Sequence, residues 1–250
     1  MPGVTRPATA GPQEDALLGR PRRAAFLTAG VLAVTAVVFA LAADHGTLAR
    51  IQRLDDAWPR RMISGRSPAL TAIAKFFNVL GLVYVTLPVR LALAGFLALR
   101  RQWWHLAAFA AAIVLSEVLI GSLKGVYDRA RPPGSLVATS GALFPSGHAI
   151  AASVTVVAAV IALVPAGRRR IWWGAAAVAF SIVMGLSRAY LAAQWLSDAT
   201  AGILLGTFCV LVTALVADQL QRRRQNRLQR AAGTQFLAGV PPAHRAEDRR

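Results

Sequence analysis

The sequence predicts an all-α, polytopic membrane protein with six transmembrane helices in a bundle. Its 250 residues are 56% hydrophobic and only 16% charged, whereas soluble domains are typically about 45–50% apolar and about 25% charged. Several apolar runs approach the roughly 20 residues that a helix needs to cross a bilayer. Short arginine clusters separate these runs, as expected where basic residues fix membrane topology.

The apolar runs predict six transmembrane spans. We expect them at about residues 24–43, 81–99, 106–123, 145–164, 171–190 and 195–217. Residues 44–66 form a polar stretch, and residues 70–80 read as an amphipathic segment lying along the membrane surface. The predicted organisation is a disordered tail over 1–19, a six-helix membrane domain over 20–218, and a basic disordered cytoplasmic tail over 219–250.

The distribution of positive charge predicts the orientation. A net charge of +17 would be compatible with a nucleic-acid partner, but the arginines cluster beside the apolar runs, so we expect the lipid bilayer as partner and no nucleic acid. With six crossings, both termini lie on one side, which the positive-inside rule makes cytoplasmic at the plasma membrane. The clusters are Arg20 with Arg22 and Arg23, Arg100 with Arg101, Arg168–Arg170, and Arg222–Arg224.

Metal or disulfide chemistry is not indicated. Cys209 is the only cysteine and lies in an apolar run, so it is expected to be a small core residue. The four histidines show no spacing with cysteine that suits a zinc site. We therefore expect no metal and no cofactor.

Two charges fall inside predicted spans. Arg90 precedes Arg100 by ten residues, and Glu117 follows His105 by twelve, so both lie at similar depth from one turn. Unpaired charges within a membrane are costly, so we expect Arg90 and Glu117 to pair; the alternative is that Arg90 lines a polar site. Gly202 and Gly206 form a small-xxx-small step that favours close helix packing.

Three short blocks place phosphate-handling side chains at the ends of predicted spans. The first runs from Lys124 to Arg131-Pro132, the second is residues 145–148 (PSGH), and the third runs from Ser187-Arg188 to Asp198. Lys124, Arg131 and Arg188 supply three cations, and guanidinium groups suit bidentate contact with phosphate oxygens. The predicted topology brings all three blocks to the non-cytoplasmic face.

The second block also has the features of an anion site. Ser146 is a favoured N-cap, and the start of a helix presents free N–H groups and positive dipole to an anion. Gly147 allows close backbone approach. His148 is suited to proton transfer near neutral pH.

Together the blocks resemble the three signature motifs of the type 2 phosphatidic acid phosphatase (PAP2) superfamily, K-x6-RP, PSGH and SR-x5-H-x3-D. The resemblance covers about residues 24–218. It implies that Lys124, Arg131, Ser146, Gly147 and Arg188 bind phosphate. It further implies that His148 protonates the leaving group, that Asp198 orients a nucleophilic histidine, and that the reaction releases phosphate without a metal. Related vanadium haloperoxidases have a similar anion site but are soluble.

Gln194 occupies the position of the nucleophilic histidine. Gln194 and Asp198 are four residues apart, so on a helix they would share a face. A carboxamide cannot act as the nucleophile. Three explanations remain: phosphate binding without turnover, slow direct attack by water, or another nucleophile such as His45, since His105 and His244 are poorly placed.

The resemblance implies a lipid-phosphate phosphatase. An amphiphilic substrate is expected at the membrane surface, such as phosphatidate, a lipid pyrophosphate or an isoprenyl phosphate. The alternatives are a catalytically impaired pseudophosphatase that binds phosphorylated headgroups, and a basic membrane scaffold that acts through its arginine-rich tail. The oligomeric state is not determined by the sequence.

Overall fold

A computed structural model of the chain describes residues 21–43, 45–124, 130–139 and 143–238. Within these residues every regular element is an α-helix, which confirms the predicted all-α class. The helices are α1 (Pro21–Ala43), α2 (His45–Ser64), α3 (Pro68–Leu80), α4 (Val83–Leu99), α5 (Trp103–Lys124), α6 (Gly147–Leu163), α7 (Arg168–Tyr190) and α8 (Leu196–Ala238).

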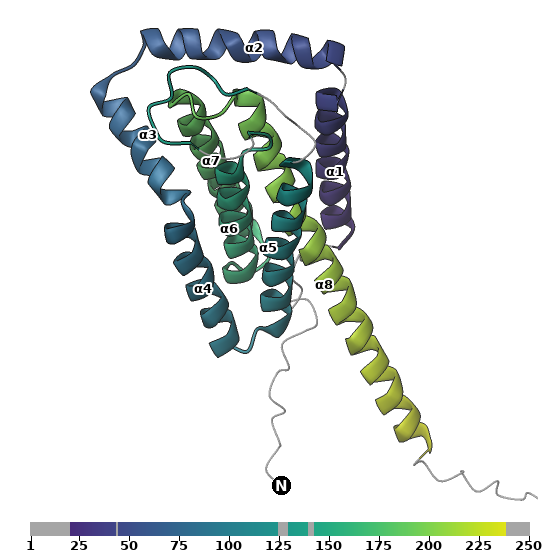
Figure 1. Ribbon diagram of the computed structural model, residues 1–250. Helices are drawn as coiled ribbons and strands as arrows, with labels where there is room; N and C mark the ends of the chain where they lie inside the picture. Colours follow the sequence, from purple (N-terminus) through teal and green to yellow (C-terminus); the bar gives the residue numbers. More distant parts are fainter. Residues whose placement is uncertain (1–20, 44, 125–129, 140–142, 239–250) are drawn as a thin grey trace, which may run out of the picture.

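The four helices α5 to α8 form the core of the bundle. α6 packs against α5, α7 and α8, and among the described helices it contributes the largest share of the main core cluster, five of its thirteen buried side chains. α1 packs on α8, α3 packs on α7, and α2 crosses one end of the bundle (Figure 1). α8 continues beyond the opposite end (Figure 1).

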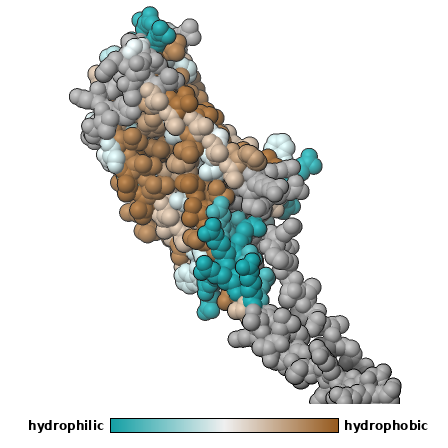
Figure 2. Space-filling view, turned by 90° about the vertical axis from the view of Figure 1, so that its right-hand side faces the viewer, coloured by the Kyte–Doolittle hydropathy of each residue, from teal (hydrophilic) through white to brown (hydrophobic). Residues whose placement is uncertain are grey.

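The apolar character of the helices fits a membrane protein. Three helical segments, Trp103–Lys124, Arg168–Tyr190 and Leu196–Ala231, are long and apolar enough to cross a bilayer. The pair α3 and α4 passes the same test as one bent unit, and Ala25–Ala40 and Gly147–Leu163 are shorter apolar helices. Figure 2 shows an apolar belt between hydrophilic ends on the side of α1 and α8. Six crossings remain a prediction.

The segment predicted to lie along the membrane surface is instead joined to the next helix as a broken unit. α3 and α4 are bent by 54° at a short break that contains Gly81 and Leu82. α3 begins with Ser67 as N-cap and Pro68 in its first turn, both favoured there. Phe77 packs against Phe180 of α7, with ring centroids 5.6 Å apart. α3 therefore lies beside α7.

Two predicted irregular segments are helical. The polar stretch after the first span contains α2, and the predicted disordered tail over 219–250 is wrong for residues 219–238, which continue α8. The continuation is rich in Gln, Arg and Leu, which are good helix formers. It is also tied by an ion pair one turn apart, from Arg222 Nε to Asp218 Oδ2 at 2.8 Å. The predicted tail over 1–19 and residues 239–250 lie outside the described residues.

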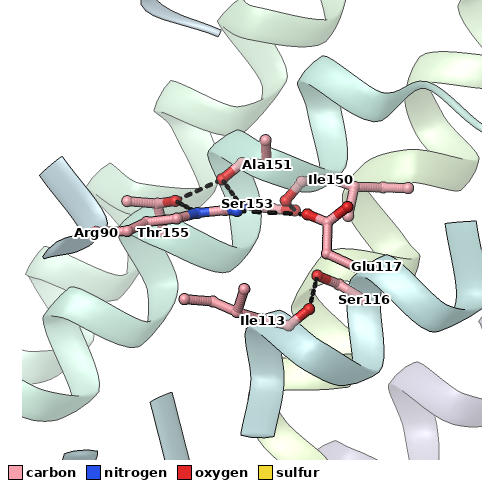
Figure 3. Close-up of polar contacts among 8 residues, drawn as sticks. All are labelled: Arg90, Ile113, Ser116, Glu117, Ile150, Ala151, Ser153 and Thr155. Carbon is pink, nitrogen blue, oxygen red and sulfur yellow. Dashed lines mark hydrogen bonds and ion pairs between the residues drawn. The ribbon is translucent and has the colours of Figure 1, made fainter. Parts of the chain in front are cut away.

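The predicted charge pair between Arg90 and Glu117 is present. Arg90 Nη1 lies 3.4 Å from Glu117 Oε1, and Arg90 Nε donates to Thr155 Oγ1 at 3.0 Å. Arg90 Nη2 also donates to the carbonyl of Ala151 at 3.5 Å (Figure 3). One guanidinium therefore joins α4 and α5 to the first half of α6, and the described contacts of Arg90 include none of the phosphate-motif residues.

Gly202 and Gly206 let α8 lie directly against α6. A Cβ atom at Gly202 would stand 2.7 Å from the carbonyl oxygen of Ser146, and one at Gly206 would stand 2.9 Å from that of Ile150. Real Cβ atoms do not approach backbone oxygens so closely, so only glycine fits at these two positions. The predicted close packing is confirmed.

We expect Gly206→Ala to destabilise the protein by about 1–3 kcal/mol, because its methyl group would overlap the α6 backbone and the side chain of Ser153. The measurement is thermal unfolding of the purified protein in detergent. Gly95→Ala is the matched control, since a Cβ atom at this helical glycine meets nothing within 4 Å. Equal melting temperatures for the two variants would contradict the packing argument.

Candidate active site

The second and third sequence blocks meet where α6 and α8 begin. The backbone N–H of Ser146 donates to the carbonyl of Asp198 at 3.1 Å, and Ser146 is fully buried. Ser146 is the N-cap residue of α6, as predicted, but its hydroxyl makes no capping hydrogen bond. A Cβ atom at Gly147 would meet nothing within 4 Å, so open space lies in front of this turn.

The turn between α7 and α8 holds Gln194. α7 ends at Tyr190 and α8 begins at Leu196, so Gln194 lies in the turn and does not share a helical face with Asp198. Asp198 instead reaches back within the first turn of α8, where its Oδ2 accepts from the backbone N–H of Trp195 at 3.0 Å. This is the acidic half of a capping box. Both Gln194 and Asp198 are buried.

The first block runs alongside this turn. Lys124 is the last residue of α5, and Arg131 Nη1 donates to the carbonyl of Ala193 at 3.1 Å. Trp195 Nε1 donates to the carbonyl of Ala130 at 2.8 Å. The loop around Arg131 is therefore fixed to the residues on either side of Gln194, through the carbonyl of Ala193 and the indole of Trp195.

Arg188 is buried near the end of α7 and contacts a residue that the sequence motifs do not include. Its Nη1 donates to the side-chain oxygen of Asn78 on α3, and only 5% of the arginine is exposed. The signal that could have identified Asn78 is a lone carboxamide within the otherwise apolar run of residues 76–80.

His148 packs against the break between α3 and α4. A Cβ atom at Gly81 would stand 3.0 Å from the ring carbon Cγ of His148 and closer still to Cδ2. His148 lies near enough to Arg188 and Lys124 to be affected by their positive charges. Arg188 is affected in the same way by Arg131. The structure thus brings the three predicted cations and the predicted general acid to one end of the bundle.

α2 is attached to the site through Asp55. Oδ1 of Asp55 accepts from the backbone N–H of Ser197 at 3.1 Å, and Oδ2 accepts from the Ser197 hydroxyl at 2.6 Å. Asp55 is buried, with 3% exposed. A second carboxylate therefore caps the N-terminus of α8, where negative charge is favourable. The sequence motifs contain Ser197 but gave no indication of Asp55.

Four signature side chains carry buried polar atoms with no hydrogen-bond partner among the described residues. They are Ser146 Oγ, His148 Nε2, Arg188 Nε and Gln194 Oε1. Only nine such atoms occur in the described chain, and most buried polar groups in proteins are paired. A concentration of unpaired atoms at one site is typical of a site that binds a polar ligand.

The other histidines do not join this group in the described structure. His105 lies near the start of α5, at the opposite end of the bundle, beside Ala108 and Ala158. His45 begins α2, but its side chain lies outside the described part, as does His244. Cys209 is buried in α8, as predicted.

Comparison with protein families places these motifs in a known group. Residues 103–222, which contain all three blocks, match the profile of the PAP2 superfamily. Just under half of the chain, with every signature position, is therefore similar to the PAP2 superfamily. A comparison with curated proteins gave no match.

Two solved PAP2-like structures share the fold. The PAP2-type phosphatidylglycerolphosphate phosphatase of Bacillus subtilis is 24% identical, with a TM-score of 0.61 over 74% of this chain and 93% of that one. Aquifex aeolicus LpxE is 24% identical, with a TM-score of 0.51 over 62% of this chain and 90% of that one. At this identity the similarity establishes the PAP2 membrane fold.

We expect Asp55→Ala to destabilise the protein by about 2 kcal/mol, because two donors of Ser197 lose their acceptor at a helix N-terminus. For a chain of this size the apparent melting temperature should fall by about 4–8 °C. Asp56→Ala is the control, since among the described residues Asp56 accepts from Gln52 within α2 and the variant should lose little. Equal effects at the two positions would show that Asp55 does not hold the site end together.

Proposed function

We propose that this protein binds the phosphate group of a phosphorylated lipid at the end of the bundle where α6 and α8 begin, and hydrolyses its ester bond. The supporting observation is the group of four buried, unpaired polar atoms at signature positions. Three of them belong to Ser146, His148 and Arg188, which can donate hydrogen bonds to phosphate oxygens.

The cations would hold the phosphate and stabilise charge on its equatorial oxygens during transfer. Arg188 is fixed by Asn78 through Nη1, which leaves Nε for the ligand. Arg131 is fixed through Nη1 to the Ala193 carbonyl. The free backbone N–H groups at the start of α6 add donors beside Gly147. Lys124 supplies a third positive charge.

His148 is the proposed general acid. Its ring is held by the close contact with Gly81, and its Nε2 has no partner among the described residues. A proton on Nε2 can pass to the leaving oxygen of the lipid as the bond from phosphorus to that oxygen breaks. The products are the lipid alcohol and inorganic phosphate.

Attack by water is the route that fits Gln194. The carboxamide is no nucleophile, but its Oε1 is a buried acceptor without a partner in the described structure. It can accept a hydrogen bond from a water molecule and orient that molecule toward phosphorus, as glutamine does in other phosphoryl-transfer enzymes. The water oxygen then forms the new bond to phosphorus, and a proton of that water passes to a phosphate oxygen. This route forms no phosphorylated intermediate at position 194.

The membrane arrangement supports an amphiphilic substrate, such as phosphatidate, a lipid pyrophosphate or an isoprenyl phosphate. In the proposed topology the three long helices, the bent pair and the two shorter apolar helices are the six crossings. Arg100 and Arg101 join α4 to α5 and Arg168–Arg170 begin α7, at the end opposite the site, so the positive-inside rule supports a cytoplasmic location for that end. Both termini then face the cytoplasm of a plasma-membrane protein, and the site opens on the other side.

The second candidate is a pseudophosphatase that binds phosphorylated headgroups without turnover. The observation that favours it is Gln194 itself, because the phosphate-binding positions are retained while the nucleophile is replaced. Both candidates require the same phosphate site and differ only in release of phosphate.

We expect Arg188→Ala to weaken binding of phosphorylated lipids at least tenfold, because it removes a buried charge-assisted donor from the site. Binding is measured with purified protein in detergent. Arg53→Ala is the control, since Arg53 is exposed on α2 at the same end. Unchanged affinity in Arg188→Ala would refute the phosphate site. Phosphate release that His148→Ala abolishes would support hydrolysis over simple binding.

We expect Gln194→His to raise phosphate release by at least tenfold, because it restores an imidazole at the missing position of an otherwise complete site. Gln194→Ala should release less phosphate than wild type, since it removes the acceptor that orients water. The measurement is inorganic phosphate released from a panel of lipid phosphates. An active wild type that neither substitution changes would contradict the role given to Gln194.

A further inference from the structure

The part of α8 that extends beyond the bundle carries a concentrated positive charge. Residues 219–231 contain no acidic side chain. They belong to the same continuous helix as the apolar segment of α8, and they leave the bundle at the end opposite the candidate site (Figure 1). Five arginines fall within nine residues of this segment, and the helix holds them in fixed positions: Arg222, Arg223, Arg224, Arg227 and Arg230.

These arginines differ in what they contact. Arg222 lies one turn from Asp218 and pairs with it at 2.8 Å, and Asp218 is buried. Arg223 and Arg227 are four residues apart, so they share another face of the helix, and both are exposed. Within the described residues, neither of these two forms a hydrogen bond or an ion pair. Arg222 therefore holds the helix, whereas Arg223 and Arg227 are available to another molecule.

Arg223 and Arg227 continue an apolar stripe on the outer surface of α8. Val216 and Leu220, where α8 leaves the bundle, are each 49% exposed. Positions 216, 220, 223 and 227 follow at steps of four, three and four residues, which keeps them on one face of a helix. On this side of the molecule, hydrophilic surface directly follows the apolar belt (Figure 2). The face that meets acyl chains at Val216 and Leu220 thus becomes basic as it leaves them.

The positions along the helix fit the headgroup layer of a membrane. At about 1.5 Å per residue, Arg223 lies about 10 Å beyond Val216 and Arg227 about 16 Å beyond it. The headgroup layer of one leaflet is about 5–8 Å thick. α8 runs obliquely to its neighbours (Figure 1), which keeps its continuation close to the membrane surface. Long arginine side chains can reach back toward the headgroups.

We propose that Arg223 and Arg227 bind the phosphate groups of anionic lipids in the leaflet at this end of the bundle. The bound lipid is a component of the bilayer and not the substrate, because the candidate site lies at the opposite end. Guanidinium groups suit phosphate oxygens, and an anionic leaflet attracts basic residues that follow a membrane span. The continuity with Val216 and Leu220 favours a lipid over an acidic protein or a nucleic acid, because the same face already contacts lipid.

The test measures lipid binding to the purified full-length protein by native mass spectrometry in neutral detergent. The probes are phosphatidylserine and phosphatidylcholine with the same acyl chains. Both are phosphodiesters, so neither presents the terminal phosphate expected at the candidate site. We expect wild type to bind phosphatidylserine about tenfold more tightly, and the Arg223→Gln, Arg227→Gln double variant to reduce this preference to less than about twofold, because each such arginine contributes roughly fivefold. An unchanged preference in the double variant would overturn the proposal.

The controls separate the stripe from net charge and from the candidate site. Arg168→Gln, Arg169→Gln removes the same charge from exposed residues at the same end and should keep most of the preference. Equal losses in the two double variants would show that only net charge matters, which overturns the assignment to Arg223 and Arg227. Arg188→Ala should keep the preference, and its loss there would place the lipid in the candidate site instead. Equal melting temperatures without lipid show that the variants are folded.

A further arm distinguishes a lipid from an acidic macromolecule. Wild type and the Arg223→Gln, Arg227→Gln variant are placed in nanodiscs that contain phosphatidylserine and are titrated with polyglutamate and with a short DNA duplex. We expect the two proteins to bind either polymer equally weakly, because lipid occupies the two arginines in wild type. Tight binding of either polymer to wild type that the double variant loses would overturn the lipid assignment.

Discussion

The close contact between α6 and α8 is the constraint on which the rest of the site depends. Gly202 leaves room for the carbonyl of Ser146 directly against α8, and the N–H of Ser146 then reaches the carbonyl of Asp198. This contact brings the starts of two helices together. Asp198 and Asp55 already accept from the N–H groups of Trp195 and Ser197 at the start of α8, so the start of α6 supplies the backbone donors of the proposed site. A larger residue at Gly202 would separate the two sequence blocks, whatever their side chains.

Residues that precede the family match also hold the side chains of the candidate site in place. The match starts at residue 103, yet Asn78 fixes Arg188, Gly81 makes room for the ring of His148, and Asp55 caps α8. The break between α3 and α4 is what brings Asn78 and Gly81 to the same level as the motif residues. α2 and α3 therefore hold residues of the candidate site in place as well as covering them.

The bundle helices and the site positions followed from the sequence because both leave local signals. Apolar length predicted the helices, and the spacing of cations, Ser146 and His148 predicted the site. The partners of Asp55 and Asn78 could not be predicted, because they lie more than 100 residues away; only the lone carboxamide of Asn78 in an apolar run marks one of the two. Helical spacing also wrongly placed Gln194 on the same helix as Asp198. The chain turns at Ala192, whose φ is positive at 53°, so Gln194 precedes α8. The prediction of a disordered C-terminal tail was wrong for residues 219–238, where good helix formers continue α8.

The role of Asp198 explains how the site can retain its shape without a nucleophilic histidine. Its Oδ2 is bonded to the backbone N–H of Trp195, and this bond needs no imidazole at position 194. The carboxylate therefore stabilises the first turn of α8, and with it the Ser146 contact, whichever side chain precedes it. Holding phosphate and attacking phosphorus are thus separable properties of this fold. Substitution of the nucleophile removes attack by an imidazole and leaves the geometry that the proposed phosphate site requires.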